Sequence, residues 1–173
     1  FVSRVDSAAD SRIQKRMESG QADLLDLCGN IAVANAIAAY DLYLEVFSGE
    51  RWDLLASAGA RTQRCLWAST STKNPAYSDI LYVEELIAPY TVNTMPPATV
   101  LAWEDHGRAR LSLEENIERA HKDLARLDAI GISMTEITDE LLVAGVKAFA
   151  DSCDALLEDI ASKASTLLET VHG

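Results

Sequence analysis

Three short apolar segments, separated by helical stretches, constrain the fold of this 173-residue chain more than any other feature. They are Phe1–Arg4, Arg64–Ser69 and Thr91–Met95. The second is apolar on both faces, which is typical of a parallel strand covered by helices on either side. Strands that alternate with helices form right-handed βαβ units. The chain is therefore expected to be α/β with a parallel sheet.

Helices are predicted where apolar residues recur at three- and four-residue steps. They are one that begins at the cap residues Asp6-Ser7, one that runs from either Ala22 or Asn30 to Phe47, and shorter ones over Glu50–Ala58, from Ser78 to Ile87 and over Pro97–His106. Trp52 and Leu55 are expected to face inward. Gly29-Asn30 is a candidate interruption of the second helix, because both residues disfavour helix interiors.

The rest of the chain is predicted to be helical. Ser112 and Ser133 each precede a glutamate by three residues and read as capping boxes. The last helix carries an apolar stripe that indicates core or helix-pair packing. The stripe consists of Leu142, Val146, Phe149, Cys153, Leu156, Ile160 and Leu167.

This order of elements is that of the last three β/α units of a barrel, over about residues 1–107, followed by C-terminal helices over about 108–173. Three parallel strands alone would leave open edges. The predicted fold is therefore the C-terminal portion of a (β/α)8 (TIM) barrel, helix-rich and with extra C-terminal helices, as one partial domain over 1–173. The apolar start at Phe1 and the late first methionine, Met17, lead us to expect that part of the barrel precedes it.

Composition and motifs limit the classes of partner and the location that are expected for this chain. A net charge of −12 argues against a nucleic-acid partner, which requires clustered Lys and Arg. No run approaches about 18 apolar residues, so no membrane association is expected. Cys28, Cys65 and Cys153 form no C-x-x-C motif, which favours a reducing, cytoplasmic location. Nucleotide-binding and zinc motifs are also missing from the sequence.

Cations follow two of the predicted strands. Ser3-Arg4 ends the first, and Ser69–Asn74, which includes Lys73, follows the second. Ligands of parallel α/β folds bind beyond the carboxyl ends of strands, and cations with hydroxyls there suit phosphate. A loop of this composition is more often a plain solvated turn, and Arg4 could equally form a structural ion pair with Asp6 or Asp10.

Four blocks resemble the transaldolase family. Phe1–Asp6 reads F-V-S-R-V-D, and Leu66–Asp79 is similar to the family's L-W-A-S-T-x-x-K-N-P-x-Y-x-D stretch. Tyr82–Pro96 resembles the approach to the eighth barrel strand and that strand itself, and Gly145–Asp151 resembles the last helix. Departures are Cys65, where proline is common, Tyr90, where aspartate is common, and the extension beyond Ile160.

The resemblance implies a barrel enzyme of the pentose phosphate pathway that moves a dihydroxyacetone unit between sugar phosphates. It implies a lysine Schiff base and no metal or organic cofactor. Carried over by residue, Arg4 and Lys73 hold the substrate phosphate, with Ser69 and Asn74 in support. The Schiff-base lysine belongs to earlier strands, so no catalytic residue is expected in this chain, which would require the N-terminal half of the barrel and be inactive alone.

Two alternatives remain open. The chain could be a non-catalytic helical interaction module, or part of a transaldolase fused to glucose-6-phosphate isomerase. Sequence upstream of Phe1 would separate the first alternative from the enzyme, and sequence beyond Gly173 would test the second.

Overall fold

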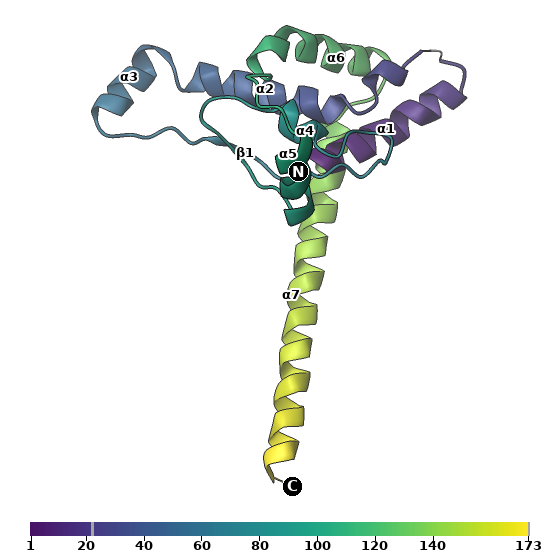
Figure 1. The fold of residues 1–173 in the computed structure, drawn as a ribbon, viewed down its shortest axis with the longest axis vertical. Helices are drawn as coiled ribbons and strands as arrows, with labels where there is room; N and C mark the ends of the chain where they lie inside the picture. Colours follow the sequence, from purple (N-terminus) through teal and green to yellow (C-terminus); the bar gives the residue numbers. More distant parts are fainter. Residues whose placement is uncertain (22, 173) are drawn as a thin grey trace. The chain divides into compact units, whose positions relative to one another are not determined.

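The computed structural model describes residues 1–21 and 23–172 (Figure 1). Side chains are described to residue 167. The chain forms two compact units, one of residues 1–134 and one that begins at Thr135. The predicted division near residue 107 stays a prediction.

The first unit is a helix-rich α/β structure, as expected from the sequence. Its helices and strands are α1 (Val2–Glu18), the 3-10 turn η1 (Leu25–Leu27), α2 (Ile31–Val46), α3 (Gly49–Ser57), β1 (Cys65–Trp67), α4 (Leu81–Glu84), β2 (Thr91–Asn93), α5 (Pro97–His106), the 3-10 turn η2 (Glu114–Asn116) and α6 (Ile117–Ala129).

The strands β1 and β2 pair in parallel, with Leu66 opposite Val92, which confirms the predicted parallel pairing. The start of the chain lies at the end of β1, where the backbone N–H groups of Val2 and Ser3 donate to the carbonyls of Ala68 and Ser69 at 2.8 and 3.0 Å. The predicted strand at Phe1–Arg4 is wrong, because α1 already begins at Val2. The segment meets β1 only beyond its last residue, where the two carbonyls accept N–H groups that the first helical turn leaves free.

Helix α2 forms the centre of the core. It contacts α1, α6 and β1, and half of its residues are buried, among them Ile31, Ile37 and Tyr40. The predicted interruption at Gly29-Asn30 is confirmed, since α2 begins at Ile31 and Gly29 has a φ of +75°. The alternative start near Ala22 is wrong, because α2 begins only at Ile31; Ala22 itself lies outside the described residues.

Two burial predictions are wrong. In α3 every residue keeps part of its surface exposed, and Leu55 is 41% exposed. Trp52 is half-buried, with its ring edge-on to Phe47 at 4.8 Å between centroids. In β1 Trp67 is buried but Leu66 is 55% exposed, so only one face of this strand is covered.

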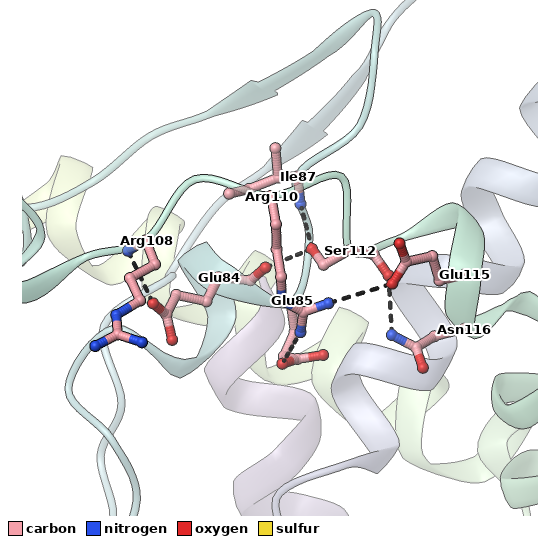
Figure 2. A network of polar contacts seen from close by, with 8 residues as sticks. All are labelled: Glu84, Glu85, Ile87, Arg108, Arg110, Ser112, Glu115 and Asn116. Atoms are coloured by element: carbon pink, nitrogen blue, oxygen red, sulfur yellow. Dashed lines mark hydrogen bonds and ion pairs between the residues drawn. The ribbon is translucent and has the colours of Figure 1, made fainter.

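A polar network ties α4 to the segment before α6 (Figure 2). Arg110 pairs with Glu85 at 3.0 Å and with Glu115 at 3.5 Å. Ser112 is fully buried; its hydroxyl accepts from the Ile87 N–H at 3.3 Å and donates to the Glu84 carbonyl. The predicted capping box at Ser112 is therefore wrong, because its hydroxyl is bound to α4 and the following residues instead of to the turn it precedes.

The second unit consists of most of α7 (Met134–His172). The seven residues of its apolar stripe are exposed, and their predicted packing stays a prediction. In the described part of the chain, no single helix is long and apolar enough to cross a membrane; only α2 and α3 taken together, bent by 69°, reach that length and composition.

Candidate functional site

A cleft of about 250 Å³ separates α1 from the loop that follows β1. Its lining side chains on α1 are Asp6, Ser7, Asp10, Ser11 and Gln14. The opposite wall is formed by Lys73, Asn74, Tyr77 and Tyr82. One face of α1, the loop at the carboxyl end of β1 and Tyr82 of α4 thus define the site.

Two buried carboxylates hold the cleft walls together. Asp6 and Asp10 are one helical turn apart and so share a face of α1. Asp6 is 1% exposed; its Oδ1 accepts from the Ala32 N–H at 2.8 Å and its Oδ2 from the Tyr82 hydroxyl at 2.7 Å. The Ala32 N–H is one of the groups that the first turn of α2 leaves without a helical partner.

Asp10 makes the same kind of junction. It is 7% exposed, its Oδ1 accepts from the Gly29 N–H at 3.0 Å, and its Oδ2 accepts from the Tyr77 hydroxyl at 2.6 Å. Each aspartate therefore links α1 to the segment that starts α2 and to a tyrosine on the opposite wall.

Burial changes the acidity of these groups. It raises the pKa of Asp6 to about 6, against the opposing effect of the hydrogen bonds from Tyr82 and Ala32. The pKa values of Tyr77 and Tyr82 are raised well above their usual range, chiefly by burial and by the nearby carboxylates. Both tyrosines therefore remain protonated donors at neutral pH.

The loop after β1 is internally ordered. Ser69 has a φ of +56°, a left-handed conformation that is uncommon for serine. The Asn74 side-chain oxygen accepts from the Ala76 N–H at 3.0 Å, and its carbonyl accepts from the Tyr77 N–H at 3.1 Å. Lys73 is exposed, and its Nζ donates to the Ser71 hydroxyl at 3.0 Å.

Arg4 lies at the start of α1. Its guanidinium is 5.0 Å from the centre of the Phe1 ring. The ion pair with Asp6 or Asp10 that the sequence left open is not formed, since among the described residues these carboxylates bind tyrosine hydroxyls and backbone N–H groups. The side chain is exposed to solvent.

The four residues predicted to contact phosphate fall into two pairs in the structure. Lys73 and Asn74 line the cleft, whereas Arg4 and Ser69 do not. Arg4 instead directly follows Ser3, whose N–H binds the Ser69 carbonyl. Convergence of Arg4 and Lys73 on one phosphate stays a prediction.

Sequence reasoning missed a second junction, at the carboxyl ends of both strands. Thr70 is fully buried, and its hydroxyl donates to Asn93 Oδ1 at 2.8 Å, with the Thr94 carbonyl at 3.2 Å. The Thr94 hydroxyl donates to the Trp67 carbonyl at 3.1 Å. The signal in the sequence was a hydroxyl or amide residue at the end of each strand.

Within the described residues, no three His, Cys, Asp or Glu side chains cluster as metal ligands would.

Comparison with known proteins identifies the family. The sequence profile of the Transaldolase/Fructose-6-phosphate aldolase family matches residues 1–160. The chain belongs to this family. The resemblance found in the four sequence blocks is thereby confirmed, and with it membership of a TIM-barrel family.

Relatives of this transaldolase-family chain agree. The Transaldolase of Parafrankia sp. (strain EAN1pec) is 49% identical over 161 residues, which are 92% of this chain and 43% of that protein. Transaldolase 1 of Streptomyces avermitilis is 48% identical over 163 residues, covering 94% and 42%. Transaldolase 2 of Nostoc sp. (strain PCC 7120) is 38% identical over 175 residues, covering 96% and 46%. The chain spans less than half the length of these relatives.

Proposed function

We propose that this chain forms the phosphate-binding side of a cytoplasmic transaldolase. The enzyme transfers a dihydroxyacetone unit between sugar phosphates of the pentose phosphate pathway through a lysine Schiff base, without a cofactor. The chain contributes Arg4, Lys73, Ser69 and Asn74 as the C-terminal part of the barrel. The Schiff-base lysine comes from barrel strands that this chain does not contain.

The position of Lys73 and Asn74 carries this proposal. Both line a cleft, and both lie in the loop beyond the carboxyl end of β1, within a block that matches the family. Barrel enzymes bind substrates at this end of their strands and often hold phosphate with the loops after the late ones. An exposed ammonium group and an amide are suitable phosphate donors.

The surroundings of the five lysines support a Schiff-base lysine that lies outside this chain. A lysine that attacks a ketone must be neutral, which requires burial or a neighbouring cation. The lysines of this chain are all exposed: Lys15, Lys73, Lys122, Lys147 and Lys163. None has the apolar environment that the chemistry needs.

The two-stranded sheet supports a requirement for the rest of the barrel. Parallel strands are normally covered on both faces, yet Leu66 of β1 is 55% exposed. Nearby, the Ser3 hydroxyl is buried without a hydrogen-bond partner among the described residues. A buried hydroxyl left in this state costs about 1–3 kcal/mol, which a neighbouring barrel segment would recover.

A chimera tests the proposal. In it this chain replaces the matching part of the Parafrankia transaldolase, which supplies the remaining strands. We expect transfer from fructose 6-phosphate, with a KM that rises on Lys73→Ala while turnover of unphosphorylated fructose is unchanged. A folded chimera without activity would favour the interaction module, and equal losses for both substrates would remove the phosphate role.

A further inference from the structure

Tyr77 is held on three sides. Its hydroxyl donates to Asp10 at 2.6 Å, and its backbone N–H donates to the Asn74 carbonyl at 3.1 Å. Its ring lies so close to Gly29 that a Cβ built there would be 2.9 Å from Cζ of the ring. Such a distance is shorter than any normal contact between carbon atoms. Gly29 therefore provides the space into which the ring packs.

Asp10 cannot move independently of the core. It is 7% exposed and also accepts the Gly29 N–H, so its position is set by both α1 and the segment before α2. The carboxylate, the glycine and the tyrosine ring form one unit, which we name the Tyr77 anchor (Asp10, Gly29 and Tyr77). The anchor contacts the core on one side and the loop after β1 on the other.

The anchor is connected to the loop after β1 through a short turn. Two hydrogen bonds, from the N–H groups of Ala76 and Tyr77, end on Asn74. Lys73 precedes Asn74, and the hydrogen bond of its ammonium group goes to Ser71 within the same loop. A displacement of Tyr77 would therefore move Asn74 and Lys73 together.

We infer that Asp10 and Tyr77 are positioning residues for substrate phosphate. The anchor holds Lys73 and Asn74 at the cleft before substrate arrives, and neither Asp10 nor Tyr77 needs to touch the reacting atoms. The inference rests on the proposed function. A displacement of about 1 Å in a positioned group can change rates by about 100-fold, so loss of one anchoring hydroxyl should be measurable.

The experiment compares Tyr77→Phe with Tyr40→Phe in the chimera. Tyr40 is a matched control: it is 1% exposed and its hydroxyl contacts Glu114 at 3.1 Å and the Pro89 carbonyl at 3.2 Å, away from the cleft residues. Both changes remove one partly buried, hydrogen-bonded hydroxyl. Readouts are KM and kcat for fructose 6-phosphate and for fructose, and amide hydrogen exchange over residues 70–79.

We expect Tyr77→Phe to raise KM for fructose 6-phosphate about 10-fold, to affect fructose much less, and to speed exchange over 70–79. Tyr40→Phe should change none of these by more than about twofold. Asp10→Asn keeps an acceptor for the Gly29 N–H and a hydrogen-bond partner for the Tyr77 hydroxyl. Its KM and exchange rates should therefore be closer to those of the unsubstituted chimera.

Two outcomes overturn different statements. If Lys73→Ala removes the preference for the phosphorylated substrate while Tyr77→Phe matches Tyr40→Phe, the positioning role is wrong and the phosphate site stands. If Lys73→Ala leaves that preference intact, the phosphate site itself is wrong.

Discussion

The Tyr82 hydroxyl donates a 2.7 Å hydrogen bond to Oδ2 of Asp6, which is 76 residues earlier in the chain. Asp6 is 1% exposed, and burial raises its pKa to about 6 from an ordinary value of 3.8. The folded state therefore holds this proton more tightly than the unfolded chain does. The resulting stabilisation is complete below about pH 4 and is lost as the pH rises through 6.

Asp6→Asn should remove this pH dependence. The amide oxygen can still accept the Ala32 N–H, and the Tyr82 hydroxyl can turn to accept from the amide nitrogen. Between pH 4 and pH 7, the unfolding free energy of the chimera that carries Asp6 should fall by about 2–3 kcal/mol more than that of the Asp6→Asn chimera. Urea unfolding of both proteins across this range measures it. A difference that does not vary with pH would mean that Asp6 has an ordinary pKa.

Thr70→Val should destabilise the strand ends. The hydroxyl of Thr70 is fully buried and bound to Asn93, so valine, with nearly the same shape, leaves the Asn93 oxygen without this donor. The expected loss is about 1–3 kcal/mol in the unfolding free energy. Thr70→Ser keeps the hydroxyl and serves as the control. If valine costs nothing while serine destabilises the chimera, the methyl group and not the hydrogen bond stabilises this junction.

Arg4→Ala should weaken binding of the phosphorylated substrate selectively. Removing a charge-assisted contact costs about 1.5–3 kcal/mol, which corresponds to about 10- to 100-fold in KM for fructose 6-phosphate. Turnover of fructose should not change. Steady-state kinetics of the chimera measures both. An Arg4→Ala chimera with an unchanged KM for fructose 6-phosphate would leave the Arg4–Phe1 contact as the only role supported for this side chain.

The isolated 173-residue chain should self-associate. The half-exposed Leu66 on β1, and apolar residues exposed along α7 such as Phe149 and Leu156, are surfaces that a soluble monomer rarely presents. Light scattering coupled to size exclusion should find oligomers for the chain alone and a uniform species for the chimera. A monomer with one cooperative thermal transition would instead make the chain an independent domain.

The sequence predicted the fold best where local patterns agree with the packing. The pairing of the two later strands, the ends of α5 and the break before Ile31 depend on apolar periodicity, proline and glycine, and the structure has all of them. The strand at Phe1–Arg4 and the capping box at Ser112 failed for one reason. In both cases the outcome depends on backbone groups that are far away in sequence but close in space. A local sequence pattern carries no information about such contacts.

The candidate site was predicted only in part. The loop with Lys73 and Asn74 was found from its cation and hydroxyls beyond a strand. Asp6 was predicted as a helix cap, which is wrong because α1 begins at Val2, and Asp6 and Asp10 were otherwise considered as partners of Arg4. Nothing near them in sequence indicates a tyrosine more than 60 residues away. Asp6 and Asp10 lie on the same buried face of α1 as Ala9 and Ile13. This spacing in the sequence indicates that the two carboxylates point into the core and not toward Arg4.

Borohydride trapping tests the central claim most directly. The chimera is incubated with fructose 6-phosphate, reduced with borohydride, digested with trypsin and analysed by mass spectrometry. We predict a reduced adduct on a lysine of the Parafrankia part and none on the lysines of this chain, which are all exposed. An adduct on Lys73 would contradict both the phosphate role of this residue and the location of the Schiff base outside the chain.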